Sequence, residues 1–186
     1  MMRGVSMANK KIKAIILTAD RFEDMELYFP YLRLIEEGIE VHVAGLKKGL
    51  IKGENGYGFE MKMLIDDVNP DDYDLLILPG GAPDGAPAMV RKSLKAQEIS
   101  KSFFAKNKPV AAICHGPYTL ISANLVKGRK MTSYWGDGVP DELKAGGAIY
   151  SDEPVVVDGN LVTSRYPWDL ADFMREMMKL VNKIKK

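Results

Sequence analysis

The chain has 186 residues, 46% hydrophobic and 27% charged, with a formal net charge of +1. This length and composition fit one globular domain, and the near-zero charge gives no electrostatic reason to expect nucleic acid or an anionic membrane as a partner. A single cysteine excludes an internal disulfide bond, and no apolar stretch has the length of a signal peptide or a membrane span. We expect a cytoplasmic protein with a flexible N-terminal extension, residues 1–10, and one domain, residues 11–186.

Strands and helices alternate in the first third of the chain. Residues 11–17 are predicted to form a strand, and the apolar side chains that follow recur at helical spacing until Gly38. Pro30 is expected to kink this helix without ending it. A strand over residues 40–44 comes next, and the glycine-rich residues 49–58 predict a small hairpin.

The middle of the chain contains two apolar strands that each end in a distinctive turn. The strand over residues 74–78 leads into Gly80 and Gly81, and the strand over residues 109–113 leads into Cys114. An amphipathic helix is expected between them because apolar residues recur there at helical spacing.

The last third of the chain is predicted to form a hairpin and a C-terminal helix. Residues 155–157 and 161–163 flank an Asp-Gly-Asn turn, and the apolar residues between 170 and 181 fall on one helical face. Apolar strands separated by amphipathic helices indicate a parallel sheet covered on both sides. The predicted fold is therefore a single-domain, three-layer α/β/α sandwich around a doubly wound, mostly parallel sheet of the flavodoxin-like type.

Cys114 stands where a strand turns into a helix, in the run Cys114-His115-Gly116-Pro117. Such an elbow presents the thiol at the carboxyl edge of the sheet, where the unpaired amides of the next helix favour a thiolate. A thiolate is a nucleophile, so this position predicts covalent catalysis. The alternative is a small buried side chain with no chemical role, since free cysteines are commonly buried.

Three segments that carry polar groups are expected to meet at this edge. Ligands of doubly wound sheets bind outside the carboxyl ends of the strands. Glu23 follows the first strand, Gly80 and Gly81 follow the strand over residues 74–78, and Cys114 ends the next strand. We interpret the backbone amides of Gly80, Gly81 and His115 as an oxyanion hole, because glycine lets the backbone approach a reacting carbonyl closely.

Several segments resemble the DJ-1/PfpI superfamily, and the resemblance runs from about Lys11 to Leu180. Within the superfamily the chain is most similar to the archaeal and bacterial PfpI branch. This branch is described variously as intracellular cysteine peptidase, as glyoxalase without a cofactor and as deglycase. The matching segments are Phe22-Glu23-Asp24 with Glu26, Leu78-Pro79-Gly80-Gly81, Ala112-Ile113-Cys114-His115-Gly116-Pro117, Gly128-Arg129-Lys130 and residues 157–165.

The resemblance implies roles for individual residues. Cys114 falls on the family's nucleophile and Glu23 on the acidic partner that shares a proton with it. The peptidase interpretation pairs Cys114 and His115 with an acid from an adjacent subunit, and Asp84 is the nearest candidate after the Pro-Gly-Gly turn. Asp84 can also be read as an ordinary turn residue between Pro83 and Gly85.

The chain lacks the residues that other classes of functional site require. Two histidines and one cysteine are too few for a soft metal site, and no dinucleotide fingerprint follows the first strand. Class I glutamine amidotransferases share the cysteine elbow but need a late histidine, which residues 164–169 do not supply. We therefore expect neither a metal nor a cofactor.

Three functions remain open at this point. The first is a cofactor-independent hydrolase or lyase that acts on small reactive carbonyls or early glycation adducts, with Cys114 as nucleophile and Glu23 as proton shuttle. The second is a cysteine peptidase that uses Cys114 and His115. The third is a redox sensor or chaperone-like stress protein in which Cys114 is oxidised. The resemblance also implies a homo-oligomer, either a dimer or a hexamer.

Overall fold

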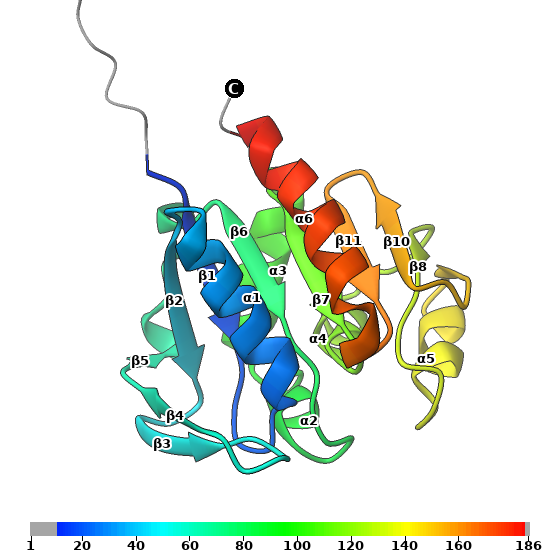
Figure 1. Ribbon diagram of the computed structural model, residues 1–186. Coiled ribbons are helices and arrows are strands. Elements are labelled where there is room, and N and C mark those ends of the chain that lie inside the picture. Colours follow the sequence, from blue (N-terminus) through cyan, green and yellow to red (C-terminus); the bar gives the residue numbers. More distant parts are fainter. Residues whose placement is uncertain (1–10, 185–186) are drawn as a thin grey trace, which may run out of the picture.

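A seven-stranded sheet in the order β10-β11-β7-β6-β1-β2-β5 forms the centre of the computed structural model, which describes residues 11–184 (Figure 1). Every neighbouring pair is parallel except β10 and β11, which form the predicted hairpin. The predicted N-terminal extension, residues 1–10, lies outside the described residues. The strands are β1 (Lys13–Leu17), β2 (Glu40–Gly45), β5 (Met63–Leu64), β6 (Leu75–Leu78), β7 (Val110–Ile113), β10 (Val155–Asp158) and β11 (Leu161–Ser164).

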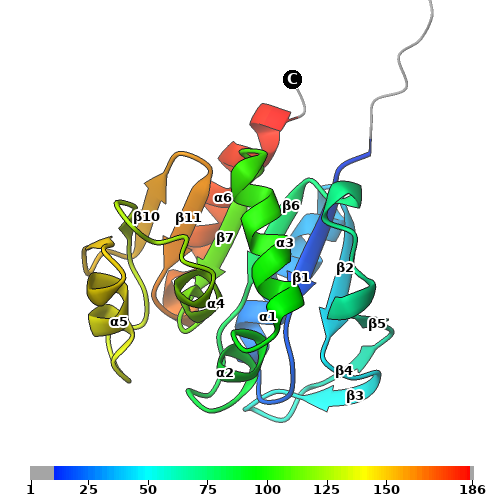
Figure 2. The same cartoon turned by 180° about the vertical axis from the view of Figure 1, so that it is seen from behind.

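Helices cover both faces of this sheet. Helices α1 (Asp24–Glu36) and α6 (Leu170–Ile184) lie on one face, and α3 (Leu94–Ala105) and α4 (Pro117–Ser122) lie on the other, as the two opposite views show (Figures 1 and 2). The predicted three-layer α/β/α sandwich is thereby confirmed. None of the helices within residues 11–184 has the length and apolar character that a bilayer crossing requires.

Smaller secondary-structure elements lie at the edges of the sandwich. The predicted glycine-rich hairpin is confirmed as β3 (Gly49–Lys52) and β4 (Gly58–Met61). The parallel pair β8 and β9 and the short helices α2 and α5 had no clear sequence signal, because each is too short to show a period. Their bounds, with the 3-10 turns, are α2 (Ala86–Val90), β8 (Lys130–Met131), α5 (Val139–Ala145), β9 (Ile149–Tyr150), η1 (Ile65–Asp67), η2 (Pro70–Asp72) and η3 (Pro167–Asp169).

The core explains why these segments adopt their structures. All residues of β6 and β7 are buried, as expected for central parallel strands that have helices on both sides. Helix α6 is amphipathic and buries Phe173, Met177 and Val181 against the sheet. Helix α1 continues through Pro30 and ends before Gly38, whose φ of 73° is readily adopted by glycine.

Truncation of Phe173, which has no exposed surface, should test how far the sandwich depends on α6. Phe173→Ala leaves a cavity between α6 and the sheet and should lower the free energy of unfolding by about 3–5 kcal/mol. The measurement is urea unfolding followed by circular dichroism. Trp168→Ala is the matched control, because this side chain is 77% exposed and its loss should change stability by less than about 0.5 kcal/mol. Equal effects of the two substitutions would contradict the packing described here.

Candidate active site

Cys114 occupies a strained turn directly after β7. Its φ is 61°, a left-handed conformation that is uncommon for residues other than glycine. The turn is fixed from both sides, because the Cys114 N–H donates to the Ser164 carbonyl and the Cys114 carbonyl accepts from the Tyr134 N–H, each at 3.1 Å. Only 7% of the residue is exposed. The elbow predicted from the sequence therefore holds the thiol in a fixed and nearly closed position.

Glu26 on α1 is the carboxyl group that contacts the thiol. It is fully buried, accepts the Gly80 N–H at 2.7 Å through Oε2, and hydrogen bonds with the Cys114 side chain. Gly80 makes this approach possible. A Cβ on Gly80 would lie 2.6 Å from both Cys114 Cβ and Glu26 Oε2, closer than real contacts allow. The thiol and the carboxyl group therefore meet across a backbone position that has no side chain.

Burial controls the proton affinity of this pair. Burial raises the pKa of Glu26 well above its ordinary value, and the nearby Glu23 carboxylate raises it further. Burial also raises the pKa of the Cys114 thiol, with a smaller contribution from the Glu26 charge, while the backbone amides of His115 and Gly81 oppose this rise. A Glu26 carboxylate disfavours a thiolate beside it, so the two groups do not titrate independently.

Glu23 does not occupy the position next to the thiol that was predicted for it. Its Oε2 accepts the Glu26 N–H at 2.8 Å and caps α1, and its Oε1 accepts from Asn55 Nδ2 at 3.3 Å. An N-cap side chain must turn back towards the first amides of its own helix, which directs it away from the sulfur. Burial raises the pKa of the half-buried Glu23 carboxyl as well. The direct acidic neighbour of Cys114 is therefore Glu26, a residue that the same motif contains.

The predicted oxyanion hole is also altered by Glu26. The Gly80 N–H is engaged by this carboxylate and so is not free to bind a substrate oxygen. The amides of Gly81 and His115, in contrast, hydrogen bond with the sulfur itself. They are the two predicted donors that face the reacting atom.

His115 lies between the thiol and a second acid that the sequence analysis missed. Its Nδ1 is 3.2 Å from Cys114 Sγ, and its Nε2 is 3.0 Å from Asp137 Oδ2. The ring packs against the rings of Tyr118 and Tyr134, with centroids 5.6 and 5.1 Å away. Burial lowers the pKa of His115, and the Asp137 carboxylate opposes this effect.

Asp84 has a different partner within the chain. Its Oδ2 accepts from Arg21 Nη1 at 2.7 Å, and its side chain is 73% exposed. In the described chain the carboxylate that binds His115 is Asp137, and a role for Asp84 across a subunit boundary stays a prediction.

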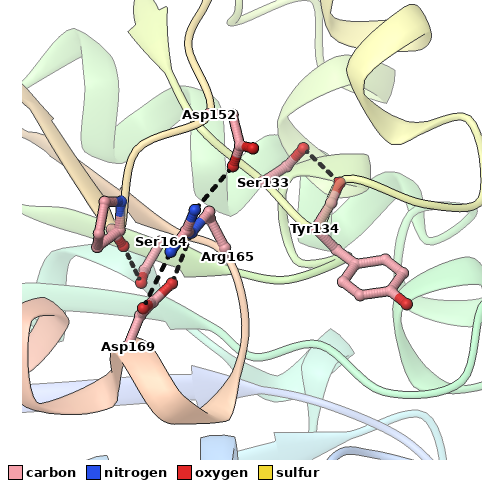
Figure 3. Close-up of polar contacts among 7 residues, drawn as sticks. Ser133, Tyr134, Asp152, Ser164, Arg165 and Asp169 are labelled. Atoms are coloured by element: carbon pink, nitrogen blue, oxygen red, sulfur yellow. Dashed lines mark hydrogen bonds and ion pairs between the residues drawn. The ribbon is translucent and has the colours of Figure 1, made fainter.

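A charged cluster fixes the strand ends beside the elbow (Figure 3). Arg165 follows β11 and donates to both Asp169, at 2.7 Å, and Asp152, at 2.9 Å (Figure 3). The guanidinium also lies over the Trp135 ring, 5.9 Å from its centroid. Because Ser164, the neighbour of Arg165, accepts the Cys114 N–H, this cluster stabilises the backbone that holds the thiol.

Two cavities are relevant to the location of the site. A cavity of about 370 Å³ is lined by residues that include Trp135, Asp137, Asp141, Tyr150 and Asp152, and neither Cys114 nor His115 is among them. A larger cavity of about 570 Å³ is bordered by α1, β2 and β4 and contains none of the residues around the thiol.

Among residues 11–184, no three histidine, cysteine or acidic side chains are grouped closely enough to hold a metal ion.

Comparison with known proteins identifies the family. The model of the DJ-1/PfpI family matches residues 12–180. The chain belongs to this family. A protein from Pyrococcus furiosus named Deglycase PfpI is 50% identical over 170 residues, which cover 91% of this chain and 99% of that one. YraA from Bacillus subtilis, named as a candidate cysteine protease, is 38% identical and covers 91% and 98% of the two chains. The crystal structure of Drosophila melanogaster DJ-1beta has a TM-score of 0.82 at 28% identity and covers 94% and 93%.

Replacement of Glu26 by glutamine should change how stability depends on pH. A carboxyl group whose pKa is raised by folding stabilises the native state below its ordinary value of 4.5, and this stability is lost as the pH rises through the raised value. Glutamine keeps an acceptor for the Gly80 N–H but carries no charge. We therefore expect Glu26→Gln to have a higher Tm than the unsubstituted protein at pH 8, and this advantage should vanish at pH 4.

The Tm is measured by differential scanning calorimetry across this pH range. Glu60→Gln is the control, because it removes the same charge from an exposed side chain on β4. If the Glu26 and Glu60 variants follow the same pH dependence, Glu26 does not have the buried, high-pKa carboxyl group described above.

Proposed function

We propose that this protein is a cofactor-independent cysteine enzyme of the deglycase and glyoxalase type, which acts on reactive carbonyls and their early adducts with amines. The observation that carries the proposal is the buried Cys114–Glu26 pair, in which a thiol and a carboxyl group of raised pKa meet beside Gly80. Conversion of an oxoaldehyde needs a nucleophile and a group that moves protons between adjacent carbons. The 50% identical relatives from Pyrococcus furiosus and Pyrococcus abyssi, which are named deglycases, support this choice.

The first step on a free oxoaldehyde such as methylglyoxal joins sulfur to the aldehyde carbon. Glu26 accepts the thiol proton, Cys114 Sγ attacks the carbon, and the carbonyl electron pair moves to the oxygen. The amides of Gly81 and His115, which face the sulfur, stabilise the charge on that oxygen. The oxygen then takes the proton from Glu26, which gives a neutral hemithioacetal and returns Glu26 to its carboxylate form.

The second step moves hydrogen along the substrate. The Glu26 carboxylate removes the proton from the former aldehyde carbon and delivers it to the neighbouring carbon, while the hydroxyl proton of the hemithioacetal passes to the former ketone oxygen. A ketone and a hemithioacetal thereby become an alcohol and a thioester. Water then cleaves the carbon–sulfur bond of the thioester. The products are a hydroxy acid and the free thiol, and the net reaction adds one water to the oxoaldehyde.

An amine adduct enters the same sequence with one additional bond cleavage. Its carbinol carbon bears both a hydroxyl and the amine nitrogen. The carbon–sulfur bond forms as the carbon–nitrogen bond breaks, the electron pair of that bond goes to nitrogen, and the nitrogen takes one proton and leaves as the free amine. The hemithioacetal that remains is identical to the one formed from the free aldehyde.

A cysteine peptidase is the second candidate. Here the observation in favour is the 3.2 Å contact between Cys114 Sγ and His115 Nδ1, the arrangement that thiol peptidases use to protonate a leaving amine. The name of the Bacillus subtilis relative points in the same direction. The small exposed area of Cys114 disfavours a peptide bond in an extended chain, because the main chain on both sides of it would have to reach the sulfur.

The two candidates are separated by assays on one set of preparations. Lactate formed from methylglyoxal should be lost in Cys114→Ala and reduced by at least about 100-fold in kcat/KM in Glu26→Gln, because the proton carrier is gone. Glu23→Gln is the matched control, and a reduction of less than about 10-fold is expected because Glu23 caps the helix. Digestion of labelled casein should be absent throughout.

Two results would contradict the proposal. Casein cleavage that depends on Cys114, without lactate formation, would favour the peptidase. Loss of lactate formation in Glu23→Gln but not in Glu26→Gln would show that Glu23, the residue predicted from the sequence, is the proton shuttle.

A further inference from the structure

We propose that Asn55 is a modification site, at which spontaneous deamidation places a carboxylate against the first turn of α1. The turn between β3 and β4 contains the dipeptide Asn55-Gly56, and Asn55 is the only asparagine of the chain that precedes a glycine. Glycine has no side chain to hinder the attack of its backbone nitrogen on the residue before it. The inference goes beyond the proposed function, because it requires neither the thiol nor a substrate.

The reaction is intramolecular until its last step. The Gly56 nitrogen attacks the side-chain carbonyl carbon of Asn55 and loses its proton to solvent. The carbon–nitrogen bond of the side-chain amide breaks, its electron pair goes to Nδ2, and this nitrogen takes a proton from solvent and leaves as ammonia. Water then opens the resulting succinimide ring at either carbonyl. The main chain continues through aspartate or through isoaspartate, which has one additional backbone carbon.

The reacting groups are exposed and weakly restrained. Asn55 and Gly56 both lie on the surface, and a Cβ on Gly56 would meet no atom of residues 11–184 within 4 Å. The Gly56 N–H donates to the Gly53 carbonyl at 3.3 Å, and the Asn55 amide donates its two hydrogen bonds at 3.3 and 3.4 Å. These distances exceed the usual range of about 2.7–3.2 Å. The attack of Gly56 on Asn55 therefore breaks only weak contacts of the reacting groups.

The Asn55 amide lies between two carboxyl groups at the start of α1. Its Nδ2 donates to Glu23 Oε1 and to Asp24 Oδ2. Glu23 is the N-cap of α1, and Asp24 is the first residue of this helix. Deamidation removes the shared donor and puts an anion in its place. Three carboxyl groups then meet where two had an amide between them, and like charges at this distance repel each other.

Asp24 has little freedom to avoid the new charge. It is 5% exposed, and its two oxygens accept the backbone N–H groups of Asn55 and Tyr57, both at 2.8 Å. A Cβ on Gly53 would collide with Asp24 Oδ2, so the loop packs directly on this carboxylate. A buried carboxylate is costly without its donors. The longer main chain of isoaspartate would also move the Tyr57 N–H away from Asp24.

The same loop is joined to the segment that leads into α1. The Glu54 N–H donates to the Phe22 carbonyl at 2.9 Å, and Phe22 also pairs with Gly81 in an isolated bridge. Glu23 follows Phe22 directly. Repulsion at position 55 therefore loosens the contact between the hairpin and the N-terminus of α1, and deamidation should destabilise the folded chain.

Peptide mapping of aged protein tests the site itself. The full-length protein is incubated at pH 8 and at pH 5, and trypsin then releases residues 53–62. Deamidation and isoaspartate in this peptide should accumulate several-fold faster at pH 8, because base promotes loss of the Gly56 N–H proton. They should also accumulate several-fold faster than at Asn107 and Asn124, which are exposed but precede lysine and leucine. Asn55→Gln should prevent the change, since its longer side chain would have to form a six-membered ring.

Asn55→Asp tests the structural consequence without ageing. It should lower the Tm by a few degrees at pH 8, because the added carboxylate repels Glu23 and Asp24. The deficit should shrink at pH 4, because protonation of the added carboxyl group removes the repulsion. Asn107→Asp is the matched control, since it adds the same charge to an exposed residue after α3 and should not lower the Tm.

Two results would overturn the proposal. The first is accumulation at Asn55 that is no faster than at Asn107 and Asn124, which would show that the turn protects the dipeptide. The second is an unchanged Tm of Asn55→Asp at pH 8, or a deficit that persists at pH 4, since neither agrees with repulsion between carboxylates. Both measurements are independent of turnover, so they can be interpreted even if the proposed function is wrong.

Discussion

The close approach of Glu26 and Cys114 across Gly80 is the constraint on which the rest of the site depends. A buried carboxyl group is costly unless it is hydrogen bonded or neutral. Here the Gly80 N–H donates to Oε2, whereas Oε1 is buried without a hydrogen-bond partner. The parallel sheet provides the geometry, because β6 and β7 are neighbours and their carboxyl ends place Gly80 beside Cys114. Any side chain at position 80 would separate the two groups and leave a buried charge without compensation.

The sandwich and the thiol were predictable because their signals are local. Apolar runs such as residues 110–113 predict buried strands, and the Cys-His-Gly-Pro turn after such a run predicts an elbow at a sheet edge, although the thiol at this elbow is only 7% exposed. The sequence around Glu23 and Glu26 does not show which of the two carboxyl groups lies next to the thiol. Both residues fall in one short motif. Glu23 caps helix α1 with its side chain, and the missing side chain at Gly80 leaves room for Glu26 beside the thiol.

Asp137 illustrates a second limit of sequence reasoning. It lies 22 residues from His115, in a loop without helical or strand periodicity, and nothing in its immediate sequence separates it from neighbouring acidic residues. Its position is decided by long-range contacts, above all by Tyr118 and by the Arg91–Glu142 pair that orders α5. The left-handed backbone at this residue is compatible with aspartate, but a sequence alone does not reveal which of several aspartates adopts it.

The 7% exposure of Cys114 also has a consequence for the shape of what can react there. Under the proposed function, a thiol with so little exposed surface should react with the tip of a long, thin group more readily than with a bulky one. A modified lysine or arginine side chain on the surface of a folded protein has this form, as does a free three-carbon aldehyde. If the proposed function holds, modified side chains of intact proteins would react without unfolding of those proteins, and selectivity would come from the length and width of the side chain rather than from the surrounding sequence.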